Sequence, residues 1–187
     1  MISDKLKTVY KNIHKETPFG KRAKIPRYLK YIIKKAKPKS IVDFGCGKGA
    51  LVKTLKEEYP DIKVIGIDPG VMEFDDPLPK VDLIISTDVL EHVEPDMIDE
   101  TLKEIQSKSR YVYHLISCAP AKLILPDGRN AHLIQESGEW WRDKFESLGY
   151  NIIKDEWNEF TKYSKQLKRE LPVKHYYILA ENTKWEA

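Results

Sequence analysis

Hydrophobic positions along the chain follow two patterns, one typical of amphipathic helices and one typical of buried strands. Apolar residues three or four positions apart predict helices over residues 3–14, 26–36, 50–58, 95–107 and 138–148. Continuous apolar runs predict strands over residues 40–44, 62–67, 81–86, 111–117, 150–153 and 176–180. This alternation favours an open α/β sheet, which binds its ligands outside the carboxyl ends of the strands.

Two stretches depart from a regular alternation. Only 13 residues separate Asp68 from Val81, so a full helix and strand do not fit there, and residues 71–74 are the one candidate strand. The insert between the last two strands covers residues 157–173. We expect a basic helix over residues 160–171 of this insert.

A glycine-rich loop lies between the strand over 40–44 and the next helix. Gly45, Gly47 and Gly49 give the spacing G-x-G-x-G. Without Cβ atoms such a loop turns tightly and approaches a ligand closely. Dinucleotide sites instead use G-x-G-x-x-G to place a pyrophosphate at a helix N-terminus. Asp43, two residues before the first glycine, is better placed for a ligand ammonium, which favours the methionine end of S-adenosylmethionine over NAD.

Asp68 ends the second predicted strand, 19 residues after Gly49. An acidic residue at this place can accept hydrogen bonds from both hydroxyls of a ribose. The alternative is an ordinary aspartate at a turn, because Pro69 and Gly70 follow it. The glycine loop upstream favours the ribose interpretation.

The third signal is the run VDLIISTDVLEHV, in which an apolar strand ends in a polar cluster. Together with D-x-G-x-G-x-G and G-x-D, this run resembles class I S-adenosylmethionine-dependent methyltransferases over residues 40–95. The resemblance implies that Glu91 and His92 lie near the cofactor. It implies the following cofactor-binding set: Asp43, Gly45, Cys46, Gly47, Gly49, Asp68, Pro69, Thr87, Asp88 and Val89.

The same resemblance implies a Rossmann-like, doubly wound α/β fold. We expect a mostly parallel, seven-stranded sheet with an antiparallel last strand. The chain would be a single methyltransferase domain, with residues 1–36 as an N-terminal helical cap and residues 40–187 as the catalytic core. S-adenosylmethionine would be the cofactor and S-adenosylhomocysteine the product. The segment 114–141 also resembles small, stand-alone methyltransferase-like proteins of bacteria and phages, a likeness that brings no substrate with it.

Methyl transfer is an in-line displacement, so an enzyme supplies alignment and, where the acceptor carries a proton, a base. Histidine has a suitable pKa for this base, and the catalytic candidates are His132, His114 and His92. For the substrate, His14 lies on the cap, Arg129 suits a carboxylate or phosphate, and Trp141 suits a planar group.

Each of these candidates has an ordinary structural alternative. His92 suits the start of a helix, and His114 lies within an apolar strand, where a histidine is commonly buried and hydrogen-bonded. Trp141 shares a helical face with Phe145, as core residues do. Arg129 follows Asp127-Gly128, which is a favourable turn sequence.

Charge is distributed unevenly along the chain. Residues 1–40 contain 13 basic and two acidic residues, so they carry +11 while the whole chain carries +3. One alternative is therefore an RNA or tRNA methyltransferase that uses Lys21, Arg22, Lys24, Arg27 and the segment 162–174 as a phosphate track. A solvated amphipathic helix explains the same charges. The D/N-P-P-Y/F motif of base methyltransferases is absent and Cys118 is not adjacent to proline, so a small-molecule acceptor is favoured.

The remaining features exclude several classes of protein. Cys46 and Cys118 lack a metal-type spacing, and we expect no metal site. No apolar stretch approaches a membrane span and the first residues lack a signal-peptide core, which predicts a cytoplasmic protein without a membrane partner. We expect a monomer or homodimer. A non-catalytic protein that binds S-adenosylmethionine is a second alternative, disfavoured by the intact glycine loop.

Overall fold

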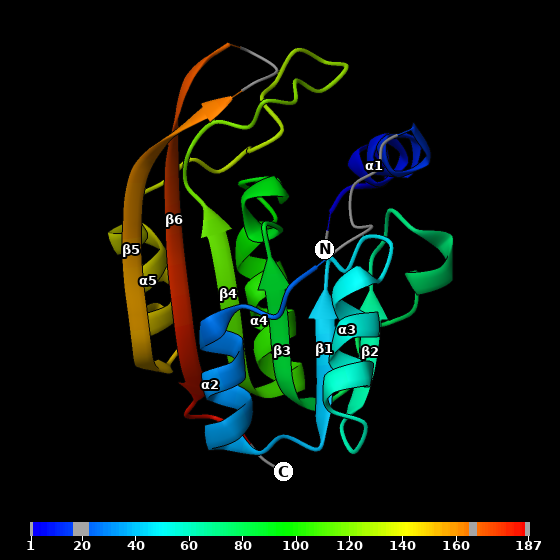
Figure 1. The fold of residues 1–187 in the computed structure, drawn as a ribbon, viewed down its shortest axis with the longest axis vertical. Coiled ribbons are helices and arrows are strands. Elements are labelled where there is room, and N and C mark those ends of the chain that lie inside the picture. Colours follow the sequence, from blue (N-terminus) through cyan, green and yellow to red (C-terminus); the bar gives the residue numbers. More distant parts are fainter. Residues whose placement is uncertain (1, 17–22, 165–167, 186–187) are drawn as a thin grey trace.

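The computed structural model describes residues 2–16, 23–164 and 168–185, which form one sheet of six strands in the order β2-β1-β3-β4-β6-β5 (Figure 1). The strands are β1 (Ser40–Phe44), β2 (Lys63–Ile67), β3 (Val81–Thr87), β4 (Ser109–Ser117), β5 (Tyr150–Ser164) and β6 (Arg169–Asn182). β1 pairs in parallel with β2 and β3, and β3 pairs in parallel with β4. β6 runs antiparallel to β4 and β5, as predicted for the last strand.

Helices cover both faces of the sheet, which confirms the doubly wound prediction. The elements are α1 (Asp4–Glu16), α2 (Arg27–Ala36), α3 (Ala50–Glu58), α4 (Ile98–Lys108), α5 (Gly138–Ser147) and the 3-10 turns η1 (Met72–Phe74) and η2 (Leu90–His92). α2 and α3 pack on one face, where Leu29 and Leu55 share a buried cluster with Leu83. α4 and α5 pack on the other face through Leu102 and Phe145. None of the helices in the described ranges is long and apolar enough to span a membrane.

The first helix lies above the carboxyl ends of β1 and β2 instead of on a face of the sheet (Figure 1). The Oγ atom of Ser3 accepts a hydrogen bond from the Leu6 N–H (3.2 Å), which makes Ser3 the helix cap that the sequence predicts. Leu6 is buried against Leu125 and Ala131. This apolar contact holds α1 against the segment that follows β4. Of the two N-terminal helices in the described residues, α1 therefore covers the strand ends, whereas α2 belongs to a face of the sheet.

The described sheet has six strands, where seven were predicted. The stretch between β2 and β3 forms turns and η1, so the strand proposed over residues 71–74 is wrong. This short stretch contains Pro69, Pro77 and Pro79, which lack the N–H group that a strand ladder requires. Phe74 turns inward and packs against the cluster beneath α2 and α3.

The two last strands form a hairpin much longer than predicted. The sequence indicated short strands over 150–153 and 176–180 with a helix over 160–171. The helix prediction is wrong for the described residues, because Phe160 pairs with Val173 within the antiparallel ladder. Aromatic side chains of β5 recur three residues apart, which resembles helical spacing. Cross-strand pairing with β6 overrides that local pattern.

The position of Trp141 generates a test of its role. The side chain is fully buried between α5 and the sheet, whereas the neighbouring Trp140 is half-buried. We expect Trp141→Ala to lower the free energy of unfolding by about 3–5 kcal/mol, because it leaves a large cavity in the core. Urea denaturation followed by circular dichroism measures this change. Trp140→Ala is the matched control and should cost about 1 kcal/mol or less. A small loss for Trp141→Ala would contradict a core role.

Candidate functional site

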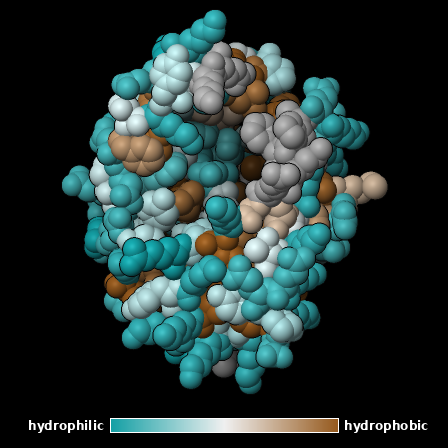
Figure 2. Space-filling view, in the orientation of Figure 1, coloured by the Kyte–Doolittle hydropathy of each residue, from teal (hydrophilic) through white to brown (hydrophobic). Residues whose placement is uncertain are grey.

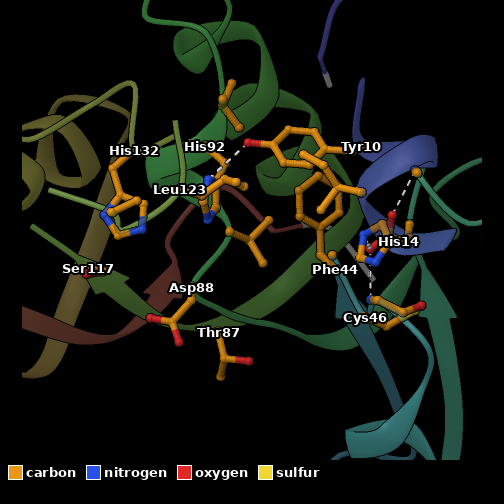
Figure 3. Close-up of a pocket in the computed structure, with 18 of the residues that line it drawn as sticks. Tyr10, His14, Phe44, Cys46, Thr87, Asp88, His92, Ser117, Leu123 and His132 are labelled. Carbon is orange, nitrogen blue, oxygen red and sulfur yellow. Dashed lines mark hydrogen bonds and ion pairs between the residues drawn. The ribbon is translucent and has the colours of Figure 1, made fainter. Parts of the chain in front are cut away.

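The carboxyl ends of the parallel strands surround a cavity of about 690 Å³. Small-molecule sites in proteins have about 300–1,000 Å³, so this cavity has the size of a ligand site. One wall comes from α1 through Tyr10, Ile13 and His14, and another comes from residues 120–123. Figure 2 shows the molecule hollowed on this side, and Figure 3 shows the side chains that line the cavity. Its place at the strand ends agrees with the sequence prediction.

The glycine loop forms one end of the cavity. Its three glycines have positive φ angles, 75° at Gly45, 54° at Gly47 and 73° at Gly49. A Cβ atom at Gly45 would lie 2.4 Å from Cγ2 of Val89, so both the backbone conformation and the space exclude a side chain. Gly45, Cys46 and Gly47 line the cavity, whereas Gly49 starts α3 outside the lining. The loop thus presents its backbone to any ligand there.

Asp68 links the glycine loop to the turn after β2. Its Oδ2 accepts a hydrogen bond from the Gly47 N–H (2.8 Å), and its Oδ1 accepts one from the Gly70 N–H (2.7 Å). The Nε2 atom of His14 lies 3.9 Å from Oδ2. Asp68 and Pro69 both line the cavity. Each carboxylate oxygen has a second lone pair, so Asp68 can accept ligand hydroxyls while it holds the loop.

Asp43 lines the same end of the cavity and is only 2% exposed. Burial, together with the negative charge of Asp68, raises its pKa to about 8. The pKa of the neighbouring Cys46 thiol is also raised, by burial and by both carboxylates, so Cys46 is a thiol at neutral pH. A cationic group beside Asp43 would stabilise its ionised form. This end of the cavity therefore suits a positively charged ligand.

Thr87 ends β3, Asp88 and Val89 follow it, and all three line the cavity. Asp88 has a positive φ of 55°, which is uncommon for a residue other than glycine. The surrounding protein partly desolvates the carboxylate and raises its pKa, against the opposing effects of His175 and His132. In Figure 3 the Asp88 carboxylate lies on the same side of the cavity as His132.

The other end of the cavity contains two histidines beside a buried glutamate. Glu91 is fully buried, and its Oε1 accepts a hydrogen bond from the Ser117 N–H (3.0 Å). Burial, and then the charge of Asp88, raises the pKa of Glu91 well above its usual range. Burial and the nearby His132 lower the pKa of His92 to about 4, and burial also lowers the pKa of His132. Both imidazoles are therefore neutral at pH 7.

Besides Gly49, three of the predicted catalytic and substrate residues lie away from the cavity. His114 is fully buried within β4, where its Nδ1 forms a hydrogen bond with the Ser86 hydroxyl (2.7 Å) and burial lowers its pKa to about 3. Arg129 forms an ion pair with Asp127 (2.8 Å) outside the cavity. Trp141 belongs to the core. All three occupy the ordinary structural places that the sequence offered as alternatives, and we leave them out of the proposed site.

The folded chain adds lining residues that the sequence did not place. The hydroxyl of Tyr10 lies 3.0 Å from Nδ1 of His92, so α1 reaches across to η2. The β4–β6 ladder pairs Ser117 with His175, and both line the cavity. Residues 120–123 complete the wall. Tyr10 lies on the apolar face of its helix, as a core residue would, so the sequence did not single it out. Ser117 and His175 are paired over a long sequence distance, which leaves no local pattern to predict them.

Comparison with known proteins points to one family. A sequence model described as "Methyltransferase domain" matches residues 19–158. The fold is similar to that of a SAM dependent methyltransferase from Archaeoglobus fulgidus (21% identity, TM-score 0.56, 83% of this chain and 91% of that chain covered). It is also similar to TehB from Haemophilus influenzae (13% identity, TM-score 0.58, 95% and 67% covered). No curated protein sequence matches.

A third similar structure is the 1,6-didemethyltoxoflavin-N1-methyltransferase of Burkholderia thailandensis, solved with 1,6-didemethyltoxoflavin and S-adenosylhomocysteine bound (12% identity, TM-score 0.54, 83% and 76% covered). At these identities the structures establish the fold, and the family match, which spans more than half of the chain, establishes the family. The chain therefore belongs to the methyltransferase-domain family and is a class I, S-adenosylmethionine-dependent methyltransferase, as its sequence predicted.

Proposed function

We propose that this enzyme transfers the methyl group of S-adenosylmethionine to a small-molecule acceptor by in-line displacement within the single cavity at the strand ends. The observation that carries the proposal is the continuity of this cavity. It extends from the glycine loop, past the end of β3, to the histidines beside Glu91. A donor and an acceptor bound at its two ends would face each other without a movement of the sheet.

The glycine loop and the two acidic residues beside it would hold the cofactor. Asp43 would face the ammonium of the methionine moiety, and Asp68 would accept the ribose hydroxyls. The backbone of Gly45 and Gly47 supports close contact, because neither has a side chain to fill the space. Thr87, Asp88 and Val89, with Pro69 and Cys46, complete this part of the lining. The bound cofactor supplies an electrophilic methyl group on a sulfonium.

The histidines at the other end would face the acceptor. His92 and His132 are neutral at pH 7, because burial lowers the pKa of each imidazole. A neutral imidazole can accept the proton of the acceptor or coordinate a cation that activates it. His132 is the leading candidate for such a role, since it lines the cavity near Asp88. His14, on the opposite wall near Asp68, belongs to the cofactor end.

The shape of the cavity favours a small acceptor over a polynucleotide. α1 covers the strand ends and packs on the segment after β4, which limits the space beside the histidines. The 1,6-didemethyltoxoflavin-N1-methyltransferase, similar in fold, was solved with a small molecule and S-adenosylhomocysteine bound. Lys21 and Arg22 of the alternative phosphate track lie outside the described residues. RNA affinity that falls steeply with salt concentration would support that alternative instead.

The first test measures cofactor binding by isothermal titration calorimetry. We expect S-adenosylmethionine and S-adenosylhomocysteine to bind with dissociation constants in the micromolar range and NAD to give no signal. Asp68→Ala should weaken binding at least about tenfold, because it removes a charged acceptor of ribose hydroxyls and the support of the Gly47 N–H.

Asp61→Ala is the matched control, since Asp61 is exposed at the amino end of β2, opposite the cavity. It should bind like the wild type. A screen of small metabolites for methyl acceptance, begun with hydroxylated and amino compounds, then tests the acceptor class. Binding that is unchanged by Asp68→Ala would contradict the proposed cofactor site.

The raised pKa of Asp43 predicts a pH dependence of cofactor binding. Below pH 8 the carboxyl is mostly protonated in the free enzyme, and an ammonium ligand favours its ionised form. Binding should therefore release a proton, and the affinity for S-adenosylhomocysteine should rise by up to about tenfold per pH unit before it levels off near pH 8. Calorimetry in buffers of different ionisation enthalpy counts the released proton.

Two controls isolate this effect. Asp43→Asn should bind with little dependence on pH between 6 and 8, because the titrating group is absent. 5′-Methylthioadenosine lacks the amino-acid moiety and should likewise bind the wild type with a flat pH profile. A steep profile for methylthioadenosine would show that Asp43 does not face the ammonium.

A further inference from the structure

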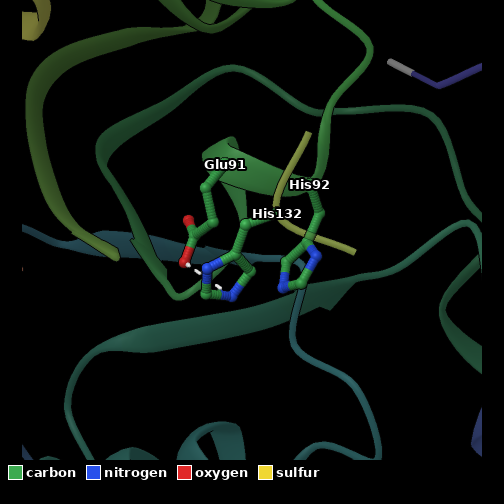
Figure 4. Close-up of side chains that lie close together, drawn as sticks. All are labelled: Glu91, His92 and His132. Atoms are coloured by element: carbon green, nitrogen blue, oxygen red, sulfur yellow. Dashed lines mark ion pairs between the residues drawn. The ribbon is translucent and has the colours of Figure 1, made fainter. Parts of the chain in front are cut away.

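Glu91, His92 and His132 bring one potential metal-ligand atom each to the same place (Figure 4). These three atoms all lie within 4.8 Å of one another, and Oε1 of Glu91 is 4.0 Å from Nε2 of His132. That separation is too long for a direct hydrogen bond. Bond lengths of about 2.0–2.2 Å place two ligand atoms of one ion about 3–4 Å apart, so small side-chain rotations would allow all three to bind one cation.

Each imidazole of this cluster is fixed through its Nδ1 atom. Nδ1 of His92 lies 2.7 Å from the Ala131 carbonyl oxygen, and Nδ1 of His132 forms a short hydrogen bond with the Ala119 carbonyl oxygen. A carbonyl oxygen only accepts hydrogen bonds, so Nδ1 carries the proton in both rings. The Nε2 atoms then have free lone pairs. Histidines that bind metals are oriented in this way by their second nitrogen.

The carboxylate of Glu91 is fully buried and only partly satisfied. Its Oε1 accepts a hydrogen bond from the Ser117 N–H, and its Oε2 has no hydrogen-bond partner among the described residues. A buried carboxylate without compensation is costly in free energy. A cation bound at Glu91 would supply this compensation. A purely structural role of Glu91 would leave Oε2 without a partner.

The backbone around the cluster holds these side chains in place. The carbonyl oxygen of Glu91 accepts hydrogen bonds from the N–H groups of Leu133 and Ile134 (2.7 and 3.0 Å). η2 and the segment that carries His132 are thus joined directly beside the ligand atoms. Glu91 and His132 are 41 positions apart in the sequence, so no local pattern predicts this arrangement. The expectation of no metal site rested on cysteine spacing alone.

We propose that Glu91, His92 and His132 bind a divalent first-row transition-metal ion, such as Mn²⁺, Co²⁺ or Zn²⁺, at the acceptor end of the cavity. Two imidazole nitrogens and one carboxylate oxygen suit these ions better than Ca²⁺ or Mg²⁺, which prefer oxygen ligands. Three protein ligands leave coordination positions open for an exogenous ligand. His92 and His132 line the cavity, so the open positions face it.

The ion would select acceptors with a hydroxyl or enol oxygen, an inference that rests on the proposed methyl transfer. Coordination lowers the pKa of such an oxygen, and its proton passes to solvent. The oxygen lone pair then forms the new O–C bond to the methyl group. The C–S bond breaks, and its electron pair stays on sulfur to give S-adenosylhomocysteine. His132 would act here as a ligand of the ion and not as the base.

Metal titration of the full chain tests this site without a known acceptor. Protein freed of metal with EDTA is titrated with Co²⁺, and visible absorption reports nitrogen ligation, while calorimetry with Mn²⁺ and Zn²⁺ gives stoichiometry. We expect one ion per chain, bound with a dissociation constant in the micromolar range or below. His132→Ala and Glu91→Gln should each weaken binding at least tenfold, and Mg²⁺ should bind much more weakly.

His175→Gln is the matched control, since His175 lines the same cavity but is not one of the three proposed ligands. It should bind Co²⁺ like the wild type. His132 is only partly buried, so His132→Ala should keep the wild-type circular dichroism spectrum and report on binding alone. Equal loss of Co²⁺ binding in His132→Ala and His175→Gln, or no loss in either, would overturn the assignment.

S-adenosylhomocysteine binding, measured on the same metal-free samples, separates the two proposals. Cofactor binding without any ion binding by the wild type overturns the metal site and leaves the proposed methyl transfer intact. Ion binding that depends on His132, without cofactor binding, supports the metal site and contradicts the proposed function. Ion-dependent methylation of hydroxylated but not amino acceptors would support the predicted acceptor class.

Discussion

The parallel pairing of β1 with both β2 and β3 is the constraint on which the site depends. Its register aligns Asp43 with Gly66 of β2 and with Ile85 of β3, so the three chains leave the sheet at the same edge. β1 is covered by helices on both faces, because Val42 is buried in the cluster on one face and Ile41 in the cluster on the other. The loop after each strand must then turn over that shared edge. The cavity follows from this geometry.

Two buried carboxylates organise the loops at that edge. Asp68 joins the glycine loop to the turn after β2 through the N–H groups of Gly47 and Gly70. Glu91 joins η2 to the end of β4 through the Ser117 N–H, and its backbone joins η2 to the segment that carries His132. Each carboxylate fixes backbone groups that approach the cavity from different strands. At both ends of the cavity, a buried carboxylate thus accepts hydrogen bonds from backbone N–H groups.

The sequence predicted those parts that short-range physics determines. The glycine spacing, the strand-end acidic residues and the run after β3 placed most of the proposed cofactor end, since each signal lies within a few residues of its strand. The long C-terminal hairpin was not predictable in this way, because the pairing of β5 with β6 overrides a pattern that resembles a helix. His114 and His132 are both catalytic candidates in the sequence, although only His114 lies within a predicted apolar strand. The register of the sheet buries His114 under Phe145. The hydrogen bonds of η2 to the segment after residue 131 bring His132 to the cavity.

The charges around the cavity are unfavourable without ligands, and this has a consequence for what the site binds. Asp43, Asp68 and Glu91 lie buried at one edge of the sheet, and Asp88 is exposed to the cavity beside them. Burial and the charge of Asp68 raise the pKa of Asp43, and burial and the charge of Asp88 raise the pKa of Glu91. The proposed cationic ligands would remove this penalty, a sulfonium with its ammonium at one end and a divalent ion at the other. A neutral or anionic ligand would not remove this penalty. The excess of acidic groups inside the cavity, in a chain whose N-terminal region is strongly basic, therefore selects the charge of what enters it.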